Sequence, residues 1–264
     1  MTTSINTSTQ SVLRTDHEGI SILTLNRPKQ FNALSLEVLE QLLAHLSSIA
    51  ASETIKVVIL AAEGKAFSAG HDLKEMKANR TQEFGDSLFG KCTEVMLAIN
   101  NLPQPVIARV QGIATAAGCQ LVAACDLAVA ADHTRFATSG INFGLFCSTP
   151  AVALSRNVGK KKAMEMLLTG EFINAQEAVL HGLVNRVVPA EELNEATLSL
   201  AQTIAAKAPD AVRMGKEMFH KQIDMPLEEA YVYASEVIVC NMLVDDVEEG
   251  LSAFVEKRKP QWGK

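Results

Sequence analysis

The chain has 264 residues, of which 48% are hydrophobic, and its formal net charge is −6. This length supports one large domain with an apolar core, and an acidic balance without a basic stripe argues against nucleic acid as a partner. Five scattered cysteines indicate reduced thiols and no metal site, and no apolar run reaches the ~18 residues of a membrane span. We therefore expect a cytoplasmic protein.

The first hundred residues alternate between strand and helix patterns. Short apolar runs bounded by turn residues indicate strands, and apolar residues at a helical period indicate helices. In chain order we expect strands at 11–13 and 20–25, a helix at 36–46 capped by Ser35, a strand at 57–61, a mobile charged segment at 78–90 and a helix at 91–99. Alternation of this kind predicts α/β architecture with right-handed crossovers.

Residues 65–76 (KAFSAGHDLKEM) form a turn of small residues after the strand at 57–61. Asp72 followed by Glu75 is the pattern of a capping box, so a helix is expected to begin at Leu73. Small residues allow backbone N–H groups to approach a ligand closely, and a helix N-terminus favours negative charge. The amide of His71 is therefore expected just outside such an N-terminus.

A second strand-to-helix turn has the same character. The strand at 105–110 leads through a turn into a buried helix at 114–125, which opens with Ala116, Ala117 and Gly118. Two such turns can aim two N–H groups at one oxygen, which is the arrangement of an oxyanion hole. The same small residues also suit close packing alone, and their spacing leaves both interpretations open.

Further strands are expected at 127–130, 135–138 and 184–188, with helices at 159–168 and 174–182, and the chain after residue 190 is helical. The expected C-terminal helices span residues 190–206, 210–221, 227–239 and 244–256. This pattern divides the chain into an α/β core at 1–190, which holds the site, and a helical oligomerisation region at 191–264.

The chain resembles the crotonase, or enoyl-CoA hydratase/isomerase, superfamily along nearly its whole length. The matching segments are residues 26–28, 32–34, 65–76, 105–119, 125–127 and 254–260, together with Phe136. Among branches of the family, the runs 115–120 and 144–150 look most like the enoyl-CoA hydratase domain-containing protein 3 group. The resemblance implies a spiral of ββα turns with a helical C-terminal region, and a homotrimer or homohexamer.

The resemblance also implies an acyl-CoA thioester as partner, bound through an enolate-like oxygen at the amides of His71 and Ala117. No cofactor is implied beyond coenzyme A as part of the substrate. The implied CoA-binding positions are Lys29, Ala69, His71, Asp72, Leu73, Lys74 and Ala117.

The chain departs from the family at the two glutamates with which hydratases add and remove water. Gln120 and Gly140 stand at those catalytic positions, and neither can exchange a proton. An enzyme of oxyanion-stabilised enolate chemistry is therefore expected, with hydration itself in doubt. The alternatives are an isomerase or decarboxylase of the same family, or a non-catalytic acyl-CoA-binding protein.

Three side-chain roles stay open on the sequence alone. The His71 imidazole either acts as an acid or base, or has only a structural role, packed against its own turn. The Gln120 amide either contacts water or the acyl group, or is a satisfied buried amide. Ser139, Asn142 and Ser148 lie around the second missing glutamate, and any of them could face the acyl chain.

Overall fold

The computed structural model describes residues 10–263 and is built on a six-stranded sheet in the order β1-β2-β3-β4-β6-β9. β1 and β2 are antiparallel, and the remaining neighbours are parallel. β1 and β2 form a hairpin, and its turn residues Glu18 and Gly19 have φ values of 48° and 79°, as a two-residue type I′ turn requires. The strands are β1 (Val12–His17), β2 (Ile20–Leu25), β3 (Val57–Ala62), β4 (Val106–Val110), β6 (Leu127–Ala131) and β9 (Arg186–Val188).

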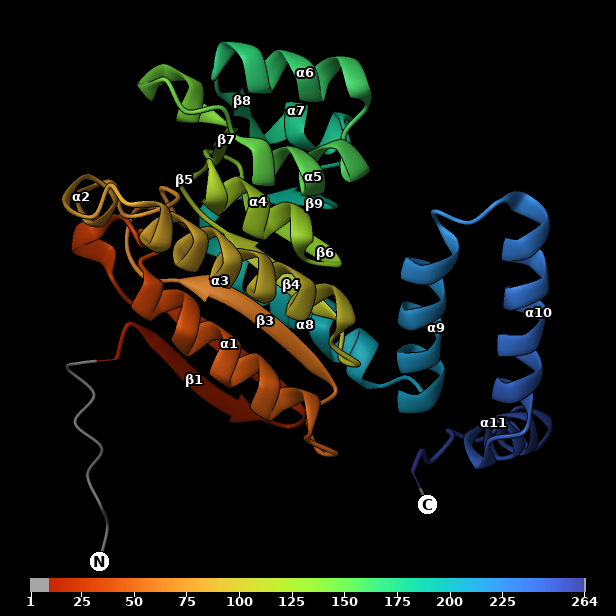
Figure 1. Ribbon diagram of the computed structural model, residues 1–264. Coiled ribbons are helices and arrows are strands. Elements are labelled where there is room, and N and C mark those ends of the chain that lie inside the picture. The colour runs from red at the N-terminus through yellow and green to blue at the C-terminus, as the bar shows by residue number, and fades with distance from the viewer. Residues whose placement is uncertain (1–9, 264) are drawn as a thin grey trace, which may run out of the picture.

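Three short strands form a second sheet in the order β5-β7-β8. They are β5 (Ile113–Thr115), β7 (Arg135–Ala137) and β8 (Ile173–Asn174). The chain passes from β4 to β5 and from β6 to β7, with helical segments after each pair, so it winds through both sheets in successive ββα turns (Figure 1). The prediction of helix from residue 114 is wrong for Ala114 and Thr115, because the Thr115 N–H donates to Ser68 O at 3.0 Å.

Helices cover both faces of the larger sheet. On one face, α1 (Leu36–Ala50) and α3 (Gln82–Asn101) pack into a core that contains Val58 and Leu60 of β3. On the other face, α8 (Leu193–Ala205) packs over Val57, Ile59 and Ala61 of the same strand. β3 is therefore buried on both sides, as its continuous apolar run predicts.

The prediction of a mobile segment at 78–90 is wrong over most of its length, because α3 begins at Gln82. Thr81 Oγ1 caps the helix by accepting the Phe84 N–H at 3.2 Å. The first turns of α3 are largely exposed, so their sequence carries no apolar period, whereas Leu88 is fully buried. A second helix that the sequence pattern did not indicate, α5 (Ser148–Asn157), follows the short helix η2 (Ser139–Phe143).

The other helices lie close to their predicted positions. They are α2 (Leu73–Ala78), α4 (Ala117–Ala124), α6 (Lys160–Thr169), α7 (Ala175–Leu180) and the short turn η3 (Ala190–Glu192). The short turn η1 (Pro28–Gln30) was not predicted. At the start of α7, Asn174 and Glu177 satisfy each other's backbone amides in a capping box.

The last three helices, α9 (Pro209–Gln222), α10 (Leu227–Met242) and α11 (Asp245–Val255), stand apart from the sheet in Figure 1. Lys216 ties α9 to the core, because its Nζ donates to Ile99 O at 2.9 Å and to Gln104 O at 3.1 Å and pairs with Asp126 at 2.7 Å. The division at residue 190 stays a prediction, and α8 beyond it belongs with the sheet.

Candidate active site

Two strand-to-helix turns meet at the centre of the molecule. The turn after β3 and strand β5 are joined by backbone hydrogen bonds, Ser68 N to Ile113 O at 3.1 Å and Thr115 N to Ser68 O at 3.0 Å. Ser68 Oγ also donates to Asn32 O at 2.9 Å, which fixes the first turn against the N-terminal segment. The sequence-predicted turns are thus side by side and held in one register.

Two glycines make this approach possible. A Cβ atom at Gly118 would lie 2.3 Å from Ser68 O, and one at Gly70 would lie 2.9 Å from Ala116 Cβ and 3.2 Å from Ala117 N. Gly70 also has a φ of 89°, in the left-handed region that glycine adopts without strain. His71 follows Gly70 directly, so its backbone lies beside that of Ala117.

The amide N–H groups of His71 and Ala117 have no hydrogen-bond partner among residues 10–263. On either side of His71, the Gly70 carbonyl accepts from Leu34 N and the Asp72 N–H donates to Leu34 O. The N–H of His71 itself takes part in neither bond. Ala117 is the first residue of α4, and first-turn amides lack intrahelical acceptors. Two unused donors on adjacent turns can bind one oxygen that carries negative charge.

Ala116 has an unusual backbone conformation, with φ of 51° and ψ of −121°. This region favours glycine, so an alanine there is strained. Its own N–H donates to Ala137 O at 3.0 Å, and its carbonyl accepts from Gln120 N at 3.0 Å. These two bonds hold the peptide that carries the Ala117 N–H.

A cavity of about 380 Å³ opens over the two amides. Its lining is mostly apolar and comes from both turns, α2, α3, η2 and the start of α5: Ala69, His71, Leu73, Met76, Phe89, Ala116, Ala117, Ser139, Gly140, Phe143, Leu145, Phe146, Cys147, Ser148, Thr149 and Pro150. Of the predicted site residues, Ala69, His71, Leu73, Ala117 and Gly140 are brought together here.

The other predicted positions lie outside this lining. Lys29 and Lys74 are exposed on η1 and α2. Asp72 caps α2 through the N–H groups of Lys74 and Glu75 and pairs with Arg27 at 3.2 Å. Burial alone would raise the pKa of the Asp72 carboxyl, but these hydrogen bonds and the guanidinium lower it.

The capping box expected at the start of α2 is only half formed. Asp72 makes its half, whereas Glu75 Oε2 accepts the Leu36 N–H at 3.2 Å. Glu75 therefore caps the neighbouring helix α1, whose N-cap Ser35 accepts from Val38 N. This exchange ties α2 to α1, and sequence spacing alone does not show which N–H group donates to Glu75.

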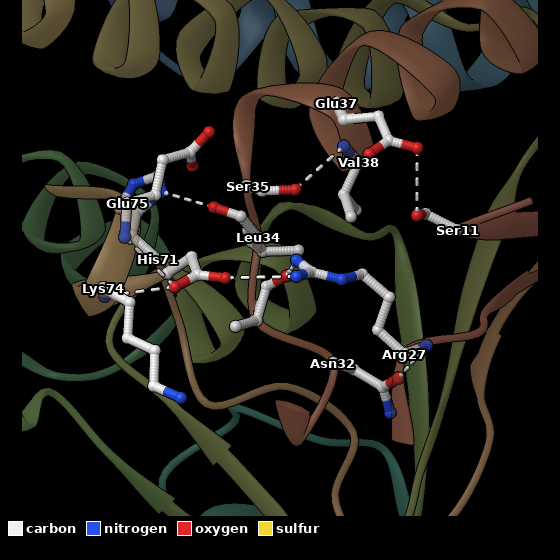
Figure 2. A network of polar contacts seen from close by, with 12 residues as sticks. Ser11, Arg27, Asn32, Leu34, Ser35, Glu37, Val38, His71, Lys74 and Glu75 are labelled. Atoms are coloured by element: carbon white, nitrogen blue, oxygen red, sulfur yellow. Dashed lines mark hydrogen bonds and ion pairs between the residues drawn. The ribbon is translucent and has the colours of Figure 1, made fainter. Parts of the chain in front are cut away.

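His71 belongs to the cavity lining, and its imidazole makes one polar contact, Nδ1 to Leu34 O at 3.2 Å (Figure 2). Its Nε2 is buried and has no partner among the described residues. The ring meets Phe89 edge-on, with centroids 5.2 Å apart. Burial lowers the pKa of His71, and the Leu34 carbonyl opposes this only in part.

Gln120 and Gly140 differ in their surroundings. Gln120 is buried on α4, one turn after Ala116, and its side chain makes no hydrogen bond to the described residues. A Cβ at Gly140 would lie 2.6 Å from Leu145 O and 2.8 Å from Cys147 Sγ. The thiol and a carbonyl therefore fill the space that a longer side chain at residue 140 would enter.

Several lining residues were not foreseen from the sequence. Phe89 lies in the helix that replaces the expected mobile segment, and Phe143, Leu145 and Phe146 form an apolar loop after η2. Of the three candidate polar residues near position 140, Ser139 and Ser148 line the cavity and Asn142 does not. Ser139 Oγ is 2.7 Å from Thr115 Oγ1, so these hydroxyls satisfy each other.

Comparison with known proteins supports the fold and the family. A model of the enoyl-CoA hydratase/isomerase family matches residues 15–264. Human enoyl-CoA hydratase domain-containing protein 3, named as mitochondrial, is 50% identical over 93% of this chain and 81% of its own length. The rat protein of the same name is 49% identical over 93% of this chain and 82% of its own.

Solved structures give the same result. An enoyl-CoA hydratase from Mycobacterium smegmatis has a TM-score of 0.94 at 55% identity, covering 96% of this chain and 99% of that one. The crystal structure of human enoyl-CoA hydratase domain-containing protein 3 also has a TM-score of 0.94, at 48% identity, covering 96% and 100%. The expected spiral fold with a helical C-terminal region is therefore confirmed.

Proposed function

The chain belongs to the enoyl-CoA hydratase/isomerase family, and from this premise we propose that it binds an acyl-CoA thioester at the cavity beside His71 and Ala117. The thioester oxygen accepts hydrogen bonds from the two backbone N–H groups, and the acyl chain enters the apolar cavity. One observation carries this proposal: two unused amide donors lie side by side on the wall of an apolar cavity.

The proposed chemistry is enolate stabilisation without the hydratase acid–base pair. No Asp or Glu is found among the described residues of the cavity lining. Gln120 cannot exchange a proton, and Gly140 is closely covered by Leu145 and Cys147. An isomerase or decarboxylase reaction, which needs the oxyanion donors most, fits this lining better than hydration. A non-catalytic acyl-CoA-binding protein is the second candidate, favoured by the same absence of carboxylates.

The CoA part of the ligand is proposed to lie outside the cavity, near the exposed ammonium groups of Lys29 and Lys74. Asp72 serves this site indirectly, by fixing the N-terminus of α2. Coenzyme A enters only as part of the substrate.

We propose that several copies assemble through α9–α11. These helices expose many large apolar side chains, more than a monomeric surface ordinarily carries in one region. The exposed set includes Phe219, Ile223, Leu227, Tyr231, Val232, Ile238, Val239, Met242, Leu243, Leu251, Phe254 and Val255. A homotrimer or homohexamer would cover them.

Membrane association and compartment are separate matters. Between residues 10 and 263, no helix combines the length and the apolar character needed to cross a bilayer. A cytoplasmic location stays a prediction, while the human and rat relatives are named as mitochondrial proteins.

Binding and hydration are tested side by side on the purified chain. Calorimetric titration with crotonyl-CoA is expected to show binding, and spectrophotometry to show hydration at least ~10³-fold slower than by a family hydratase. Gln120→Glu, which restores one carboxyl group, is the matched variant. Absence of binding would overturn the proposed site, and rapid hydration that does not depend on residue 120 would overturn the proposed loss of hydratase chemistry.

A further inference from the structure

The cavity lining contains only two side chains that can exchange a proton, among the described residues: His71 and Cys147. Burial raises the pKa of the Cys147 thiol, so this group stays protonated at neutral pH. An enolate reaction needs a group that accepts a proton from carbon. Among the lining side chains, the imidazole of His71 is therefore the group that can accept this proton.

The hydrogen bond at Nδ1 fixes the tautomer of His71. A backbone carbonyl can only accept a hydrogen bond, so Nδ1 carries the proton that it donates to Leu34 O at 3.2 Å. Nε2 then holds a lone pair in the neutral ring. This nitrogen is buried without a partner among the described residues, so it is an acceptor that no protein donor occupies.

The ring is held by the contact of Nδ1 with Leu34 O and by the edge contact with Phe89, and its backbone is fixed as well. The same residue supplies the N–H proposed to bind the thioester oxygen, and Gly70 and the α2 cap at Asp72 fix that backbone on both sides. The carbon next to the thioester carbonyl is separated from the bound oxygen by only two covalent bonds. The residue that holds the thioester oxygen through its N–H therefore also carries the base, so the base and the carbon that loses the proton belong to neighbouring groups.

We propose that His71 Nε2 is the base that removes a proton from the carbon next to the thioester carbonyl. This inference rests on the proposed acyl-CoA function of the cavity. The C–H bond breaks, an N–H bond forms on Nε2, and the electron pair moves into an enolate whose oxygen is held by the amides of His71 and Ala117. The imidazolium then returns the proton to the same carbon, or to the γ-carbon of a β,γ-unsaturated chain, which moves the double bond.

The surroundings of the ring set the expected pH dependence. Asp72 is engaged by Arg27 and the α2 amides, Glu75 by Leu36 N, α3 contributes Phe89, and α4 contributes no charged residue. Burial lowers the pKa of His71 below the ordinary value for histidine, so the neutral base is the main form at pH 7. Proton removal is expected to be constant above that pKa and to fall as the pH drops through it.

The test measures exchange of the α-protons of butyryl-CoA in D₂O by mass spectrometry. The full chain is compared with His71→Asn, because the asparagine amide can still donate to Leu34 O but has nothing at the Nε2 position. The matched control is His45→Asn, since burial also lowers the pKa of His45 but that residue lies outside the cavity lining. His71→Asn is expected to slow exchange at least ~100-fold with butyryl-CoA binding nearly unchanged, and the control is expected to exchange like the parent.

The outcomes separate the inference from the proposed function. Exchange by His71→Asn at the parent rate would overturn the assignment of Nε2. A parent chain that binds butyryl-CoA by calorimetry but exchanges no α-proton would also overturn it, while the binding site would stand. A parent chain that binds no acyl-CoA would overturn the proposed function and the inference with it.

Discussion

Replacing Ala117 with proline removes one proposed oxyanion donor. The Ala117 N–H has no protein acceptor among residues 10–263, and the residue is the first of α4, where proline is compatible with a helix. No backbone hydrogen bond of the fold is therefore lost. Loss of one such donor typically costs about 3 kcal/mol of stabilisation of the charged oxygen, which corresponds to roughly a 10²-fold weaker affinity for a ligand that carries it.

The assay compares two ligands by calorimetry: free CoA and a CoA analogue that carries an enolate-like oxygen. Ala117→Pro is expected to weaken the analogue by about 10²-fold and to leave free CoA nearly unchanged. Circular dichroism establishes that the variant is folded. Ala117→Gly, which keeps the N–H, and Lys160→Pro, which places a proline at the exposed first residue of α6, serve as controls. If folded Ala117→Pro binds the analogue as tightly as the parent, the oxyanion-hole assignment is wrong.

Three further predictions concern the turns and the surface. Ala116→Gly is expected to raise the free energy of unfolding in urea by about 1 kcal/mol, because glycine relieves the strain at φ of 51°; a lower free energy would contradict this. Gly118→Ala is expected to lower that free energy by about 3 kcal/mol, because its Cβ would lie 2.3 Å from Ser68 O, and an unchanged unfolding curve would refute the close approach. Light scattering is expected to give a trimer or hexamer, and the mass of a single chain at micromolar concentration would contradict the proposed assembly through α9–α11.

The two turns could be predicted because their chemistry is local. Small residues after an apolar strand and Asp72 ahead of Leu73 indicate a turn and a helix start without knowledge of distant contacts. Gly70 and Gly118 show why the residues are small: each faces backbone of the other turn at distances that exclude a Cβ. The likeness to the family supplied the pairing of the two turns, which spacing alone does not give.

The missed features depend on tertiary contacts. β5 has three residues, too few for an alternating pattern, and it becomes a strand because β7 pairs with it and Ser68 bridges to it. The beginning of α3 faces solvent, so it lacks an apolar period until Leu88 enters the core. Glu75 can cap either α2 or α1, and the N-terminus of α1 comes within its reach only in the folded chain. Propensity and periodicity carry no information on such choices.

In the site, too, local features could be predicted and features that depend on tertiary contacts could not. His71 and Ala117 were located from sequence, whereas the tautomer of His71 depends on Leu34 and the edge contact depends on Phe89. The covering of Gly140 by Leu145 O and Cys147 Sγ also has no local signal, because it arises where the loop after η2 folds back. These contacts determine which groups can exchange a proton, so the chemistry of the site could not be predicted from the sequence without the fold.

A crystal structure with an acyl-CoA thioester bound tests the central claim most directly. The carbonyl oxygen is expected about 2.7–3.1 Å from both the His71 and Ala117 nitrogens, with the acyl chain among the apolar lining residues. A thioester oxygen that contacts neither amide, or an acyl chain seated outside this cavity, would contradict the account.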